Sequence, residues 1–463
     1  MAERARVSNG SEWQTELLQW LTPFLAALPR STQRRWAPVY VEGLLGPSPR
    51  KSVEPMAATV AVGDYDQLHH FLSTTAWDAA PVLGALAATA QDMVGGPGAV
   101  LIVDDTTLLK KGTHSVGVGQ QYSGQAGKLA NCQTLVSLTL ARDEVPLPIA
   151  LRLFLPKAWA VDARRCRQAG VPPEAQVHRQ KWQLALEELD RVREAGVTFG
   201  LVLADAAYGS CAEFRQGLTA RGLTWAVGVR TNQFVYPRSV RLTWHYGHGG
   251  HRRRRKHPLP ATPPESVVNV AARRLKWHRV TWRHGTKGRL TAEFAALRVR
   301  TATEIALISG WKVPGAEAWL VGERRADGRE QFYLSNLPPT ATLRELAAAV
   351  KARWSCEQAH QQLKEELGLD HFEGRSWTGL QHHALLTMLA FAFLQHRRLR
   401  SIAPREADGK KIQPRSQPPS CPTRYSASLT QPPRHSAPHP RSRPVDLRAP
   451  MYHLRLTHLR ASA

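Results

Sequence analysis

The chain has 463 residues, 43 % of them apolar with 14 tryptophans, and its excess of basic over acidic residues gives a formal net charge of +25. That much apolar material excludes a wholly disordered basic protein, and the length suffices for about two to four domains. A charge of this size favours a polyanionic partner, above all nucleic acid. Apolar stretches fall short of the roughly 20 residues of a membrane-spanning helix, and Met1–Trp13 has no apolar signal core, so we expect a cytoplasmic protein without a membrane partner.

The five cysteines are scattered singly along the chain, with no Cys-x-x-Cys pair. This pattern argues against a disulfide framework and against a zinc knuckle, so we expect reduced thiols. The cysteines are Cys132, Cys166, Cys211, Cys356 and Cys421.

The N-terminal part reads as helical. From Trp13 to Leu72 the apolar residues recur at helical spacing, and the Gly95–Gly98 segment ends the pattern with strong breaker residues. We therefore predict a helical domain over residues 1–97.

An α/β pattern follows. Residues 99–103 form a short apolar run that ends in Asp104-Asp105, which is typical of a strand buried on both faces. Two more strands, 133–141 and 147–155, are expected as a hairpin around 142–146. The remaining expected elements are a helix over 182–192, a strand at 199–204, a helix over 210–221 and a strand at 223–229, which gives the order β-β-β-α-β-α-β.

The character of the chain then changes twice. Strand-like stretches within 231–340 predict a separate β-rich insertion, after which a helical pattern runs from 343 to 367, with Gly368 as its C-cap, and a second apolar helix covers 380–394. The α/β core would thus comprise 98–230 and 341–400. Residues 401–463 are rich in Pro and Arg and predict a disordered tail.

Acidic residues stand at the ends of two of the expected strands. Asp104 and Asp205 each follow an apolar run, and the carboxyl ends of strands in α/β sheets are where ligands and ions bind. Arg353, Glu357 and Lys364 are spaced by four and seven residues, which places them on one helix face. Taken singly, each Asp is also explained as a turn or helix-cap residue, and the Arg–Glu pair as a surface ion pair.

These blocks together resemble the DDE transposases of bacterial insertion sequences, in the subgroup whose RNase H-like core is interrupted by β-strands. The similarity extends over roughly residues 12–397, in family order. It rests on four blocks: Val103–Thr107 with Lys110–Gly112, Ala204–Gly209, Tyr333–Leu337, and the helix of Arg353, Glu357 and Lys364.

The resemblance implies a catalytic and metal-binding triad of Asp104, Asp205 and Glu357, with Asp105 as the rival for the first position. It also implies two Mg²⁺ (or Mn²⁺) ions, since carboxylates suit hard cations and a pair of ions suits phosphodiester chemistry. His114, His178 and His360 are not needed as ligands. The family's Tyr three residues before the Arg is replaced here by Val350, which removes any role of that hydroxyl.

Contacts with DNA are expected from two groups of basic residues. Arg353 and Lys364 would bind phosphates beside the scissile bond. The run Arg252, Arg253, Arg254, Arg255 and Lys256 is either a DNA-lining stretch or a solvated loop. Trp277, Trp282 and Trp319 are either core residues or stack on an unpaired base.

The sequence therefore predicts a transposase that binds its element's inverted ends, cleaves DNA by metal-assisted hydrolysis and joins the 3′-OH to target DNA. Double-stranded DNA is the expected partner, with a homodimer assembled on it, no small-molecule substrate, and a bacterial nucleoid location. Two alternatives stay open: an inactive relic that only binds DNA, motivated by Val350 and the Pro/Arg-rich tail, and an RNase H-like nuclease that cuts without joining.

Overall fold

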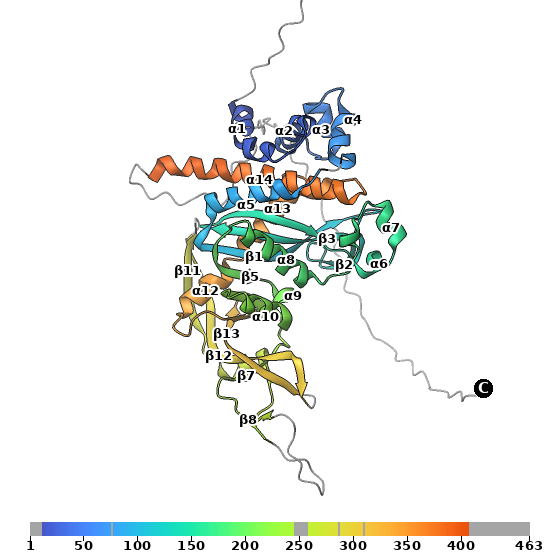
Figure 1. Ribbon diagram of the computed structural model, residues 1–463. Helices are drawn as coiled ribbons and strands as arrows, with labels where there is room; N and C mark the ends of the chain where they lie inside the picture. Colours follow the sequence, from blue (N-terminus) through green and yellow to red (C-terminus); the bar gives the residue numbers. More distant parts are fainter. Residues whose placement is uncertain (1–11, 76, 245–257, 286–287, 309–310, 407–463) are drawn as a thin grey trace, which may run out of the picture. The chain divides into compact units, whose positions relative to one another are not determined.

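One large mixed sheet organises the chain in the computed structural model, which describes residues 12–75, 77–244, 258–285, 288–308 and 311–406 (Figure 1). Five strands form its centre in the order β4-β3-β1-β5-β6. β1 runs antiparallel to β3 and parallel to β5, and β5 is parallel to β6. The α/β class and the RNase H-like core are thereby confirmed. The bounds are β1 Gly96–Leu109, β3 Lys128–Arg142, β4 Val145–Leu153, β5 Phe199–Ala204 and β6 Trp225–Val229.

The predicted hairpin is present between β3 and β4. Its two turn residues, Asp143 and Glu144, both have positive φ (49° and 66°). Two such residues in succession give the turn whose twist matches that of the flanking strands, and Asp tolerates this conformation better than most side chains. A further strand, β2 (Gly119–Ser123), pairs with β3 and was not expected, because its polar residues carry no apolar alternation.

The segment 231–340 is rich in β-strands, as predicted, and apart from the pair β8–β9 these strands join the core sheet. β14 pairs with β6, so these strands extend the core sheet in the order β6-β14-β13-β12-β7-β10, with β11 paired to β12. Without β14, β6 would be an edge strand with unpaired backbone N–H and C=O groups, and β14 pairs with that edge. The bounds are β7 Phe234–Pro237, β10 Glu265–Ser266, β11 His278–Gly285, β12 Gly288–Ile308, β13 Trp311–Arg324 and β14 Glu330–Ser335, with the small pair β8 Leu242–Thr243 and β9 Leu259–Pro260 and the helix α11 Val267–Arg274.

Helices cover both faces of the sheet. On one face α5, α13 and α14 pack against β3 and β4, with α12 against β5 and β6, and on the other α8 packs against β3 and β4, with α10 beside it. The bounds are α5 Ala80–Val94, α6 Lys157–Ala160, α7 Ala163–Gln168, α8 Lys181–Glu194, α9 Ala206–Gly209, α10 Ala212–Ala220, α12 Leu343–Lys351, α13 Trp354–Glu365 and α14 Trp377–Glu406.

The N-terminal helices lie against α14, which separates them from the sheet (Figure 1). α14 is buried almost all round from Leu380 to Leu394, as an all-apolar helix requires. It continues to Glu406, past the predicted start of the tail at 401. The remainder of that predicted tail, 407–463, lies outside the described residues. The N-terminal helices are α1 Glu12–Ala26, α2 Ser31–Leu45, α3 Val53–Val60 and α4 Tyr65–His69, followed by a π-helical turn, His70–Thr74.

The single helix expected over 343–367 is broken. α12 ends at Lys351 and α13 begins at Trp354, so Ala352 and Arg353 form the joint between them. Lys351 is drawn back to the buried Glu323, with Nζ 2.7 Å from Oε1. Gly368 is not the C-cap that was predicted: the cap of α13 is Glu366, and Gly368 follows two residues later with a positive φ (66°).

His383 connects three segments in the core. Its ring nitrogens lie 2.8 Å from Tyr40 Oη on α2 and 3.0 Å from the carbonyl oxygen of Gly368. Burial lowers the pKa of His383 from 6.5 to about 4. Between these two pH values the imidazole of His383 is therefore protonated in the unfolded chain and neutral in the folded protein.

We expect acid to destabilise the protein through this group. As pH falls from about 7 to about 4, the unfolding free energy should drop by up to about 3 kcal/mol more in the wild type than in His383→Gln. Urea titrations at each pH measure both curves. Parallel curves for the two proteins would show that His383 does not carry this dependence.

Candidate functional site

The register of the two central parallel strands brings Asp104 and Asp205 together. Val103 on β1 pairs with Ala204 on β5, so the residues that follow them lie side by side at the carboxyl edge of the sheet. Asp205 is also the N-cap of α9, where its Oδ1 accepts hydrogen bonds from the backbone N–H groups of Ala207 (2.9 Å) and Tyr208 (3.2 Å). The capping role and a place in an acidic cluster therefore coexist.

Asp104 and Asp105 point to opposite faces of the sheet, as successive residues of a strand do. Asp104 faces α13, on the same side as Ile102 and Cys356. Asp105 faces α8 and α9, where both of its oxygens have partners: Lys181 Nζ at 2.6 Å from Oδ2 and Tyr208 Oη at 2.5 Å from Oδ1. Asp104 thus faces the helix that carries Glu357, while Asp105 is held by other residues.

Arg353 joins two of the carboxylates. Its guanidinium lies 2.7 Å from Asp104 Oδ2 and forms an ion pair with Glu357 one turn along the helix. Burial alone would lower the pKa of Arg353, but the charges of Asp104, Glu357 and Asp205 outweigh it and raise that pKa. The Arg353 guanidinium therefore interacts electrostatically with all three acidic groups.

The three carboxylates carry more negative charge than Arg353 can neutralise. Burial raises the pKa of Asp104 to about 7, with Arg353 opposing the shift and Asp205 adding to it. Burial also raises the pKa of Asp205. One guanidinium does not neutralise three carboxylates, so further cations at this edge would be bound favourably.

Comparison with known proteins identifies the family of this chain. The family model described as "DDE superfamily endonuclease" matches residues 23–289, which is more than half of the chain. The chain belongs to the DDE superfamily of endonucleases. It is also 28 % identical over 194 residues to the "Probable transposase for insertion sequence element IS701" of Microchaete diplosiphon, a match that covers 42 % of this chain and spans about half (48 %) of that protein.

Among solved structures, this chain is similar to one described as "Cryo-EM structure of piggyBac transposase synaptic complex with hairpin DNA (SNHP)". The similarity has a TM-score of 0.38 and 11 % identity, and covers 88 % of this chain and 75 % of that one. A likeness at this level adds no argument about the site.

The carboxylate donors of this site fit hard divalent cations. Carboxylate oxygens are the ligands that Mg²⁺ and Mn²⁺ prefer, and Asp104 and Asp205 are partly buried whereas Glu357 is exposed. The acidic groups come from β1, the end of β5 and α13, three elements held by the sheet and its covering helix.

In the described part of the chain no helix is long and apolar enough to span a membrane.

Other predicted site residues lie further away. Lys364, two turns along α13, is half-buried, and its Nζ donates to Gln125 Oε1 at 3.4 Å. Val350, at the position of the family's tyrosine, is buried with Leu346 in the core beneath α12. Arg252–Lys256 lie outside the described residues. His178 donates from Nδ1 to the backbone carbonyl oxygen of Leu155 at 3.1 Å.

Sequence analysis did not identify the side chains that surround the aspartates. Lys181 and Tyr208 hold Asp105, and a buried polar group of Cys356, His360 and Ser137 lies behind Asp104. Tyr208 had one signal, its place three residues after Asp205. Lys181 had none, because only the tertiary packing of α8 brings it to β1.

Two cavities flank the extended half of the sheet. One, of about 930 Å³, lies beside α12 and α13 and is lined by Trp282, Trp354 and Lys351 among others. Trp282 is half-buried and packs edge-on against Phe294, so it has both a core contact and a place on this wall.

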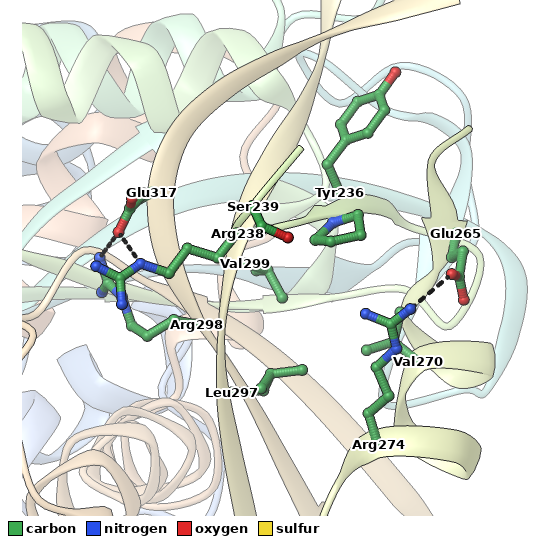
Figure 2. A pocket seen from close by; sticks show the side chains of 11 residues that line it. Tyr236, Arg238, Ser239, Glu265, Val270, Arg274, Leu297, Arg298, Val299 and Glu317 are labelled. Atoms are coloured by element: carbon green, nitrogen blue, oxygen red, sulfur yellow. Dashed lines mark hydrogen bonds and ion pairs between the residues drawn. The ribbon is translucent and has the colours of Figure 1, made fainter. Parts of the chain in front are cut away.

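The other cavity, of about 380 Å³, lies between β7, α11 and β12 (Figure 2). Its arginines are matched by acids: Arg238 and Arg298 meet Glu317, and Arg274 meets Glu265. These ion pairs use the charge that an anionic ligand would need, so we assign it no function.

The Tyr208–Asp105 bond is expected to stabilise the fold. Tyr208→Phe should lower the unfolding free energy by about 1.5–3 kcal/mol, because it removes a hydrogen bond to a half-buried carboxylate. Urea denaturation measures this, with Tyr122→Phe, an exposed tyrosine on β2, as the matched control. In an Asp105→Ala background, which removes the acceptor, the same change should cost much less, and full additivity of the two would rule out the coupling.

Proposed function

We propose that this chain is the transposase of an insertion sequence, which binds the inverted ends of its element, hydrolyses the phosphodiester bond there and joins the exposed 3′-OH to target DNA. The observation that carries the proposal is that Arg353 pairs with both Asp104 and Glu357, while Asp205 follows the strand residue that pairs with Val103, in a chain of the DDE superfamily. Asp104 is preferred to Asp105 because it faces α13, the helix that carries Glu357, whereas Asp105 faces α8 and α9.

Asp104, Asp205 and Glu357 would hold two Mg²⁺ or Mn²⁺ ions. Such ions supply an activated attacking oxygen and a stabilised leaving oxygen in phosphodiester chemistry. The protein's own contribution is rigidity: Asp205 is fixed by two backbone N–H groups, and Asp104 Oδ1 accepts from the N–H of Asp105 at 2.8 Å. Arg353 and Lys364, on the same helix as Glu357, would orient the phosphates beside the scissile bond.

The remaining parts of the chain have supporting roles in this proposal. The helical segment 1–97 would bind the element's ends, and Arg252–Lys256 would contact the DNA backbone. Both ends must be processed together, so a homodimer on double-stranded DNA is proposed, acting in the bacterial cytoplasm at the nucleoid. The +25 charge supports the choice of partner, since each phosphate contact releases counterions.

Removal of a carboxylate should abolish cleavage and spare binding. With Glu357→Ala or Asp205→Ala we expect no Mg²⁺-dependent cleavage or joining of a labelled duplex carrying the DNA that flanks the gene. Binding of the duplex should stay within a few-fold of the wild type, because these groups contact metal and not a DNA groove. Asp105→Asn is the matched control and should retain cleavage.

The outcomes separate the alternatives. Joined products from the wild type alone support a transposase, whereas cleavage without joining supports an RNase H-like nuclease. Binding without cleavage by the wild type identifies an inactive relic. Loss of activity in Asp105→Asn but not in a variant of Asp104 would transfer the first position of the triad to Asp105.

Arg353 and the metal ions require the same carboxylate oxygens, so they should compete. In DNA-free protein, Arg353→Gln should tighten Mn²⁺ binding about tenfold once Asp104 is ionised, which requires a higher pH in this variant because Arg353 lowers the pKa of Asp104. Electron paramagnetic resonance of free Mn²⁺ measures this without any catalytic assay. A DNA phosphate offers Arg353 another partner, so added duplex should tighten Mn²⁺ binding to the wild type more than to Arg353→Gln.

Lys364→Gln is the control for that experiment. It removes a cation from the same helix but leaves the Arg353 ion pairs untouched, so Mn²⁺ affinity in DNA-free protein should hardly change. If Arg353→Gln weakens Mn²⁺ binding, Arg353 positions the carboxylates for the ions, and the competition is refuted.

A further inference from the structure

A second group of metal-ligating side chains lies directly behind Asp104. Cys356 and His360 stand one turn apart on α13, on the face that covers β1 and β3. One ligand atom from each of Asp104, Cys356 and His360 lies within 4.8 Å of the other two. Cys356 and His360 are buried, whereas Asp104 reaches the carboxyl edge of the sheet.

The spacing of the sulfur and the imidazole suits a tetrahedral ion. Cys356 Sγ is 3.5 Å from His360 Nε2 and 4.0 Å from Nδ1. A zinc ion bound at about 2.3 Å to sulfur and about 2.0 Å to nitrogen, with tetrahedral angles, separates these atoms by about 3.5 Å. The helix therefore already presents two of the ligands at the required distance.

The surroundings favour a soft cation over Mg²⁺. Ser137 Oγ lies 2.8 Å from His360 Nε2 and Thr139 Oγ1 lies 3.4 Å from Cys356 Sγ. A metal ion bound at Nε2 would therefore replace the contact with Ser137. Thiolate and imidazole are ligands that Zn²⁺ binds and Mg²⁺ avoids.

We propose that Asp104, Cys356 and His360 form a binding site for Zn²⁺ or a similar soft divalent ion, distinct from the Mg²⁺ site but sharing Asp104 with it. Binding converts the Cys356 thiol to a thiolate and releases one proton to solvent. A zinc ion held by Asp104 engages a carboxylate that the triad needs and adds positive charge beside the Mg²⁺ site, so an occupied zinc site should weaken Mg²⁺ binding. This consequence, though not the site itself, rests on the proposed function.

Cobalt is the probe for the site. Metal-free, full-length protein is titrated with Co²⁺ under anaerobic conditions and without DNA. We expect a thiolate-to-cobalt charge-transfer band in the near ultraviolet that saturates at one equivalent. Stoichiometric Zn²⁺ should bleach it, whereas Mg²⁺ should weaken it only in large excess, because Mg²⁺ competes for Asp104 alone. Cys356→Ala should lose the band, whereas Cys211→Ala and Cys421→Ala should retain it.

A second variant guards against misfolding of Cys356→Ala. His360→Gln keeps the thiol but loses a ligand, so Co²⁺ affinity should fall at least about tenfold and the band should shift. Absence of the band in the wild type, or its persistence in Cys356→Ala, would overturn the proposal.

Competition then tests the shared ligand. Zn²⁺ should release Mn²⁺ from wild-type protein but not from Cys356→Ala, and release from both would place Zn²⁺ at the triad instead. Because the cobalt band requires no DNA cleavage, a wild type that shows the band but never cuts DNA would reject the transposase proposal and leave the zinc site standing.

Discussion

Parallel pairing of β1 with β5 sets Val103 opposite Ala204, and the acidic cluster follows from that register. A shift by one residue would turn Asp104 toward α8 and Asp105 toward α13, exchanging their surroundings. Both strands are apolar and central, with neighbours on either side, so such a shift would also expose the core residues of each. The strand register that buries the core residues is therefore also the register that places the carboxylates side by side.

Helix α13 completes the cluster because the chain breaks between α12 and α13. A continuous helix through Ala352 and Arg353 would keep the direction of α12, which packs on β5 and β6. The joint lets α13 cover β1 and β3 instead, with Glu357 and Arg353 toward Asp104 and with Cys356 and His360 toward Ser137. One helix thus carries two kinds of ligand to one aspartate.

The sequence allowed the class of fold, the central strands and the convergence of Asp104 with Asp205 to be predicted, because short apolar runs ending in Asp are local signals. Membership of the DDE superfamily was likewise predictable from the order of the motifs. What local patterns could not give was pairing at a distance: the extension of the sheet through β14 on β6, the break at Ala352, and the contacts of Lys181 with Asp105. Which residues carry the chemistry stays a prediction, and the contrast between the partners of Asp104 and Asp105 is what the structure adds to it.

The burial of α14 on all sides affects how the protein can be divided for study. The helix touches the N-terminal helices on one side and β4 on the other, and its middle turns, around Phe391, are shielded by both. A truncated polypeptide that begins at β1 would leave a long apolar helix facing water along the surface that α2 normally covers. Such fragments should aggregate on expression, so end recognition and catalysis have to be separated by point substitution within the intact chain.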